Sequence, residues 1–153
     1  MNSIWEKGAM HRGGAVVALA ALAQFVTVQS TSAQSELGFK MPSRNIYCIV
    51  EQADDTRPTD LRCDIQEMNN RMPAPPPNCP LSWGDAFSIT QNGSSGQRVC
   101  HGDTTKNDDL PALAYGSVWN ESGFTCKSQT SGLTCTNASG HGFSLTRASQ
   151  RTF

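Results

Sequence analysis

Short stretches of alternating apolar and polar residues follow one another along the chain after residue 33. Apolar side chains at every second position place one face of an extended strand against a core. The pattern predicts strands over 45–51, 61–66, 85–91, 97–100, 114–120, 124–128, 133–137 and 143–147, and a short segment at 37–41 is a further candidate. Residues 64–71 have room for one helical turn. We therefore expect an all-β fold, a small barrel or sandwich of about seven or eight short antiparallel strands.

The segment 124–137 is predicted to form a hairpin clamped by a disulfide. Cys126 and Cys135 are separated by eight residues, and folding the chain about their centre leaves 129–132 as a glycine-containing loop. The two cysteines then face each other across the ladder at nearly the separation that a disulfide needs. Phe124 and Leu133 flank them on the same face. Two reduced core cysteines are the alternative, and the compartment inferred below argues against it.

The segment 45–66 repeats this arrangement around the polar turn 52–60, which predicts the disulfide Cys48–Cys63. Duplication of one hairpin, or two hairpins under the same physical constraint, explains the similarity. By elimination the remaining pair is Cys79–Cys100. Six cysteines allow 15 connectivities, so the sequential pairing is a prediction from two hairpins and a remainder.

Residues 1–33 have the features of a secretory signal peptide that is removed on export. Lys7 and Arg12 precede the apolar run 15–28, which is too short for a membrane span, and small residues lead to cleavage after Ala33. The start codon is that of Met1 or Met10. An even number of cysteines in an exported chain predicts three disulfides and a periplasmic or extracellular location.

The mature part, 34–153, is predicted to be a single domain. Removing residues 1–33 leaves ten basic and twelve acidic residues, which excludes the basic surface of a nucleic-acid binder. After cleavage no stable membrane anchor remains. The proline-rich segment 72–80 is expected to run extended, either as a stiff strap tied down by Cys79 or as a docking motif for a proline-recognising module.

His101 and Asp103 are the weak catalytic candidates of the sequence. A histidine two residues from an aspartate suits a general base that is oriented by a carboxylate. The alternative is that Asp103 caps a turn and His101 ends a strand. No G-x-S-x-G motif supports a serine nucleophile.

His141, between Gly140 and Gly142, is the weak candidate for ligand binding. The two glycines also suit a tight corner before the last strand, which is the structural explanation. Neither a cofactor motif nor a metal-ligand spacing is present, so we predict no cofactor and no metal. The acidic groups 54–60 and 103–109 lack the spacing of a calcium loop.

Several motifs together resemble a family of small secreted bacterial proteins known only as a domain of unknown function. The motifs are MPSRNIYC at 41–48, LRCDI at 61–65, Cys79 with WG at 83–84, CHGDT at 100–104, LAYG at 113–116, GFTC at 123–126, GLTCTN at 132–137 and GHGFSLTR at 140–147. The usual first motif has glycine where this chain has Arg44. The resemblance implies a bacterial, exported, disulfide-bonded domain and brings no activity.

Three functions are compatible with these features. The leading hypothesis is a non-enzymatic exported β-domain that binds a small ligand or an envelope or extracellular protein. A second is a small secreted hydrolase that uses His101 and Asp103. A third is an inhibitor of an extracellular enzyme that presents the 52–60 loop.

Overall fold

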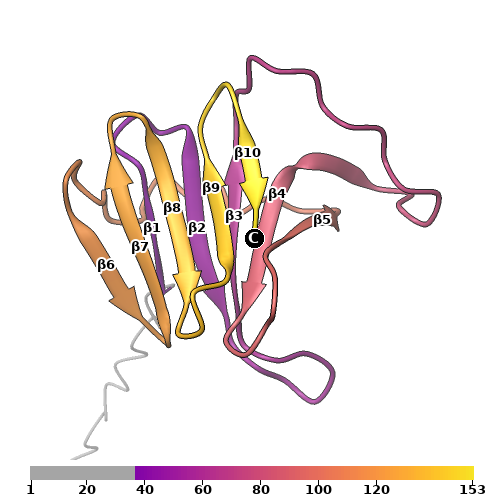
Figure 1. The fold of residues 1–153 in the computed structure, drawn as a ribbon, viewed down its shortest axis with the longest axis horizontal. Helices are drawn as coiled ribbons and strands as arrows, with labels where there is room; N and C mark the ends of the chain where they lie inside the picture. The colour runs from indigo at the N-terminus through magenta and orange to yellow at the C-terminus, as the bar shows by residue number, and fades with distance from the viewer. Residues whose placement is uncertain (1–36) are drawn as a thin grey trace, which may run out of the picture. The chain divides into compact units, whose positions relative to one another are not determined.

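The computed structural model describes residues 37–153 (Figure 1). The predicted signal peptide 1–33 and the start of the domain at residue 34 lie outside these residues. The described part contains strands and no helix, so the turn of helix considered at 64–71 is absent. The strands are β1 (Gly38–Lys40), β2 (Ile46–Glu51), β3 (Asp60–Ile65), β4 (Ser82–Thr90), β5 (Gln97–His101), β6 (Val118–Glu121), β7 (Phe124–Gln129), β8 (Gly132–Asn137), β9 (Gly142–Leu145) and β10 (Gln150–Thr152).

The strands form two antiparallel sheets of five, with the orders β1-β2-β3-β4-β5 and β10-β9-β8-β7-β6. Each sheet is therefore a meander in chain order. The sheets lie face to face and do not close on each other, so the fold is a sandwich (Figure 1). In both sheets the second and third strands are the cysteine-clamped hairpin, β2–β3 in one and β7–β8 in the other.

The core lies between the sheets and consists of the inward-facing residues of the alternating strands. Phe39 of β1 packs against Trp119 of β6 with ring centroids 5.1 Å apart, and Phe87 of β4 packs against Phe143 of β9 at 6.1 Å. Both aromatic contacts thus join one sheet to the other, and Phe39, Phe87 and Phe143 are almost completely buried.

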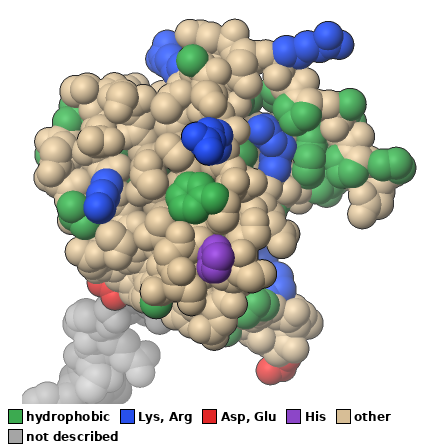
Figure 2. All heavy atoms as spheres, in the orientation of Figure 1, with side chains coloured by type: hydrophobic (Ala, Val, Ile, Leu, Met, Phe, Trp, Pro, Cys, Tyr) green, Lys and Arg blue, Asp and Glu red, His purple; other side chains and the backbone are tan. Residues whose placement is uncertain are grey.

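The three disulfides are the pairs that the sequence predicts: Cys48–Cys63, Cys79–Cys100 and Cys126–Cys135. The two hairpin bridges are fully buried in the core, each with a Cα–Cα distance of 4.1 Å. The third lies near the surface and fastens the proline-rich segment to β5. That segment, 72–80, has no regular structure and is mostly exposed, and hydrophobic side chains gather over it in Figure 2.

The predicted register of the β7–β8 hairpin is correct, and its turn is tighter than expected. Cys126 pairs with Cys135 and Ser128 with Leu133, but Gln129 also pairs with Gly132, which leaves two residues in the turn. Gly132 has φ +153°, and a Cβ there would lie 2.3 Å from the carbonyl oxygen of Leu145 on β9. Close approach of the backbones requires glycine at this position.

Several strand boundaries differ from the predicted ones. β4 begins three residues early, because Ser82 and Trp83 pair with β5 ahead of a bulge. β6 covers the end of the predicted strand 114–120. β10 was not predicted, because its three residues are half-buried or exposed and show no alternation. Backbone hydrogen bonds to β9, rather than side-chain burial, hold it in the sheet.

The turn before β2 keeps the backbone that glycine would adopt. Arg44 has φ +55°, in the left-handed region that a non-glycine residue enters at a cost. Its guanidinium pairs with Asp108 at 2.8 Å, and both side chains are half exposed or more. Arg44 therefore occupies a backbone conformation that glycine would adopt without this cost.

Candidate functional site

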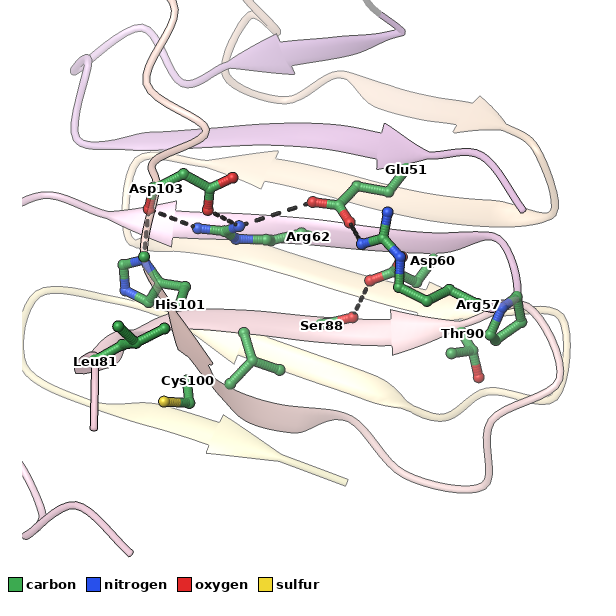
Figure 3. Close-up of a pocket in the computed structure, with 13 residues that line it drawn as sticks. Glu51, Arg57, Asp60, Arg62, Leu81, Ser88, Thr90, Cys100, His101 and Asp103 are labelled. Carbon is green, nitrogen blue, oxygen red and sulfur yellow. Dashed lines mark hydrogen bonds and ion pairs between the residues drawn. The ribbon is translucent and has the colours of Figure 1, made fainter. Parts of the chain in front are cut away.

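An open groove of about 610 Å³ lies on the outer face of the β1–β5 sheet. Strands β2 to β5, the 52–59 turn, Leu81 and the residues that follow β5 all contribute to the lining. The inner faces of β3 and β4 pack in the core. Because successive side chains of a strand point to opposite faces, the polar residues of these strands lie on the outer face. Arg62 of β3 and Ser88 of β4 occupy the middle of the groove (Figure 3).

The charged side of the groove is organised by Arg62. Its Nε and Nη2 donate to the two carboxylate oxygens of Asp64 at 3.0 and 3.2 Å, and its Nη1 donates to Asp103 Oδ1 at 2.7 Å. Asp64 is buried beneath the segment that follows β5, whose Thr105 N–H donates to the Asp64 carboxylate at 2.8 Å. The Arg62 side chain is 8% exposed, so this cation is held inside a network of the protein's own carboxylates.

A row of ion pairs extends from this centre along the groove. Arg62 lies 3.8 Å from Glu51, and Glu51 accepts a hydrogen bond from Arg57 Nη1 at 2.7 Å. Figure 3 shows Asp103, Arg62, Glu51 and Arg57 in sequence along one side. The hydrogen bond and charge of Arg62 hold the pKa of Asp103 below its usual range. The Asp103 carboxyl group is therefore ionised at neutral pH.

The opposite side of the groove is apolar. Leu81, Val99 and Cys100 line it, and Leu81 is 58% exposed. Figure 3 places Leu81 and Cys100 across from the row of ion pairs, with Ser88 between the two sides. The Cys79–Cys100 disulfide fixes Leu81 beside β5, because it closes the chain two residues before that leucine. The groove is thus amphipathic across its width.

His101 ends β5 at one end of the groove, and both of its ring nitrogens are engaged. Nδ1 lies 2.6 Å from the backbone carbonyl oxygen of Asp103, and Nε2 lies 2.9 Å from Asp85 Oδ1. A carbonyl oxygen and a carboxylate oxygen accept hydrogen bonds, so the two contacts suit a ring that donates from both nitrogens, as an imidazolium does. Burial alone would lower the pKa of His101, but these two hydrogen bonds outweigh it and raise that pKa.

This geometry differs from the arrangement that a His101–Asp103 general base requires. The Asp103 carboxylate binds Arg62, and only the Asp103 main chain contacts the histidine. A general base needs a ring nitrogen with a free lone pair, and an imidazolium with two acceptors offers none. His101 therefore acts as a cationic clamp between the β4–β5 pair and the segment that follows β5.

His141 and its glycines lie at the other end of the sandwich and do not meet His101. The corner is fastened by Asn137, whose Oδ1 accepts from the N–H of Ser139 and of His141 at 3.0 and 3.1 Å. Asn137 Nδ2 donates to the carbonyl oxygens of Thr90 and Gly93 beside the β4–β5 turn. The whole length of β5 separates this turn from His101.

Backbone geometry explains why both positions of the corner are occupied by glycine. Gly140 has φ +81°, and a Cβ on Gly142 would lie 1.9 Å from the carbonyl oxygen of Cys135. The tight-corner explanation therefore accounts for the pattern around His141, and the groove does not include that histidine.

Two of the aspartates considered for calcium, Asp54 and Asp108, accept hydrogen bonds from the protein's own donors. Asp54 Oδ1 accepts hydrogen bonds from the Thr56 hydroxyl, the Thr56 N–H and the Arg57 N–H, which lower the pKa of Asp54 to about 2. Asp108 binds Arg44 and the Tyr47 hydroxyl. Within residues 37–153, the one cluster with metal-ligand potential is Cys48, Cys63 and Cys135, whose sulfurs are bonded in disulfides.

Sequence reasoning found His101 and Asp103 but missed their partners. The alternation of 61–66 already placed Arg62 and Asp64 on the outer face of a strand, which is the signal that could have found them. Asp85 had no such signal. It reaches His101 because the β4–β5 register shifts at a bulge between Trp83 and Phe87, which no local pattern reports.

The fold and the groove define an all-β, disulfide-stapled sandwich with a polar–apolar cleft on one outer face. A family model described as "Family of unknown function (DUF6636)" matches residues 18–153, and the chain belongs to that family. No curated protein and no solved structure matches the chain. In the described part of the chain, no helix is long and apolar enough to cross a membrane. The three disulfides indicate an oxidising compartment.

Proposed function

We propose that this chain is an exported, non-enzymatic binding domain, and that the groove beside Arg62 is its ligand site. The observation that supports the proposal is the amphipathic lining, with the row from Asp103 to Arg57 on one side and Leu81 with Val99 on the other. Ligand sites combine apolar surface with a few fixed polar groups, and a volume of about 610 Å³ lies in the range of small-molecule pockets.

Rigid support of the lining favours binding. Arg62 and His101 are buried and each is held by two or more partners, so the polar groups keep their positions before a ligand arrives. Preorganised groups lose little conformational entropy on binding. The disulfide at Cys100 gives the apolar side the same rigidity. The hydrolase alternative draws no support here, because His101 has no free ring nitrogen.

Export of the mature chain is part of the proposal. The signal-like segment 1–33 and the three disulfides support it. A periplasmic or extracellular position would let the disulfides persist.

The test is a ligand screen on the oxidised, exported protein, monitored by amide chemical shifts. Mono- and disaccharides, amino acids, and alkyl amines, acids and alcohols would be titrated separately. We expect at least one class to move the amide signals of residues 99–103 with saturation. Leu81→Ala should weaken that binding about fivefold, since it removes part of the apolar side.

Val118→Ala is the matched control, because Val118 is 50% exposed on β6 in the other sheet. An equal loss of binding affinity in Leu81→Ala and Val118→Ala would contradict the proposed site. Amide shifts confined to residues outside the groove would contradict it as well. A measured turnover that His101→Ala abolishes while the fold stays intact would contradict the non-enzymatic part of the proposal.

A further inference from the structure

We infer that the groove selects an amphipathic cation, an organic amine whose charged group lies against Asp60 and Asp103 and whose apolar part lies along Leu81 and Val99. This inference rests on the proposed binding function and names the chemistry of the ligand. The positive and negative groups of the groove differ in what each already binds.

Four of the five N–H donors of the Arg62 guanidinium already bind acceptors of the protein. Three of its nitrogen positions already donate to Asp64 and to the Asp103 carboxylate, and Nη2 also donates to the Asp103 carbonyl oxygen at 3.0 Å. The side chain is 8% exposed. An anionic ligand would find one Nη1 N–H at most, and its own charge would face the carboxylates that Arg62 already binds.

The Arg57 guanidinium is likewise engaged at the far end of the row. Nη1 donates to Glu51 at 2.7 Å and Nη2 lies 3.4 Å from Asp54. Both arginines of the groove therefore neutralise the protein's own acidic groups. An anion at either arginine would therefore compete with carboxylates of the protein.

The lining of the groove carries three cations and three carboxylates. The cations are Arg57, Arg62 and His101, and the carboxylates are Glu51, Asp60 and Asp103. Each of the three cations also pairs with a carboxylate outside the lining, Asp54, Asp64 or Asp85. With its cations paired in this way, the groove favours a positive group wherever a lining carboxylate keeps an open acceptor oxygen.

Two of these carboxylates are open to a ligand. Among residues 37–153, Asp60 accepts one hydrogen bond, from the Ser88 hydroxyl to Oδ2, and its Oδ1 has no donor. Asp103 binds Arg62 through Oδ1, and its side chain is 78% exposed. Both line the groove, on the same outer face as Ser88 (Figure 3). An ammonium group, with up to three donors, suits such acceptors.

The apolar side sets the second requirement. Leu81 and Val99 present aliphatic surface opposite the carboxylates, and no described lining residue is aromatic. An aliphatic chain next to the amine would cover this surface, whereas a small inorganic cation would leave it in water. An alkylammonium ion has both parts.

The experiment titrates n-octylammonium, n-octanoate and 1-octanol, each below its aggregation limit, into the oxidised, exported protein. Amide shifts of residues 60–62 and 99–103 report the groove. We expect octylammonium to bind at least tenfold more tightly than octanoate or octanol, with an affinity that falls as salt is raised.

Asp60→Asn and Asp103→Asn keep the shape of each side chain and remove its charge. Each should weaken octylammonium binding at least threefold and narrow its advantage over octanol. Asp109→Asn removes a carboxylate that does not line the groove and should have no such effect. Two separate variants keep the test informative where one of them perturbs folding.

The outcomes separate this inference from the proposed function. Equal binding of the amine and the alcohol in the groove, or unchanged amine affinity in both asparagine variants, overturns the inference and leaves a ligand-binding groove in place. If none of the ligands here or in the broader screen moves the groove signals, the proposed function falls as well.

Discussion

At the residue scale, the contacts of His101 favour a structural role as a cation over the catalytic role considered from the sequence. Its two neighbours, the Asp103 carbonyl and the Asp85 carboxylate, are both acceptors at 2.6 and 2.9 Å. These contacts tie the end of β5 to the bulged start of β4, where Ser82 pairs with His101. The residue that sequence reasoning selected for chemistry thus stabilises one end of the groove.

This assignment predicts a pH dependence of stability. Because the pKa of His101 is raised in the folded protein, its contribution is fully present below its unfolded pKa of about 6.5. The contribution is lost as pH rises through the raised folded pKa. We expect His101→Gln to be less stable than the wild type at pH 6, with a difference that narrows towards pH 9, in urea unfolding.

Asp85→Asn should also reduce the stability difference between the protein with His101 and the His101→Gln variant, since it removes the charge that His101 faces. Imidazole nitrogen NMR gives the direct reading, with both His101 ring nitrogens protonated at pH 6.5. A neutral ring at that pH, with one nitrogen unprotonated, would contradict the imidazolium and reopen the general-base role.

At the element scale, one asparagine joins turns of the two sheets. Asn137 is 4% exposed at the end of β8, and its amide makes four hydrogen bonds. Two of these hold the 138–141 turn, and two reach the β4–β5 turn in the opposite sheet. The corner around His141 is therefore a joint between the sheets.

Asn137→Ala should lower the free energy of unfolding by about 2–3 kcal/mol, because buried backbone groups in both turns lose their partner. Urea denaturation measures this change. Asn120→Ala is the control: Asn120 is exposed and, within residues 37–153, its side chain binds only the Thr125 hydroxyl, so we expect a change within about 0.5 kcal/mol. Equal changes in the free energy of unfolding of the two variants would contradict the proposed role of Asn137 in joining the sheets.

The hairpins show how far element-level prediction extends. Cys126 and Cys135 at matching distances from a turn define the register of β7–β8, since a shift by one residue would move Phe124 and Leu133 out of the core. The same reasoning defines β2–β3. It fails for β10, because backbone pairing alone holds that strand and leaves no periodic pattern.

At the scale of the whole molecule, the two meanders repeat one arrangement. Strands two and three of each sheet are a cysteine hairpin, and the two bridges meet in the core, where the sulfurs of Cys48, Cys63 and Cys135 lie within 4.8 Å of one another. Each bridge cross-links its own sheet. The sheets themselves are joined by side-chain packing and by turn contacts such as those of Asn137.

The mass of the exported protein tests the signal peptide and the disulfides together. We expect an intact mass for residues 34–153 less six hydrogens, because three disulfides form after cleavage behind Ala33. Non-reduced peptide mapping should recover the three sequential pairs. Retention of residues before Gln34 would contradict the cleavage site, and any bridge from Cys126 to a cysteine other than Cys135 would contradict the pairing.

By itself, the sequence determined the all-β class, the two clamped hairpins and their register, because strand period and cysteine spacing act over a few residues. Only the tertiary structure decided that the strands form two open meanders in a sandwich. It also decided that Asp85, rather than the Asp103 carboxylate, faces His101, and that Arg62 neutralises Asp103. These contacts join residues that are far apart in the chain, across a bulge and between strands, where no local periodicity can report them.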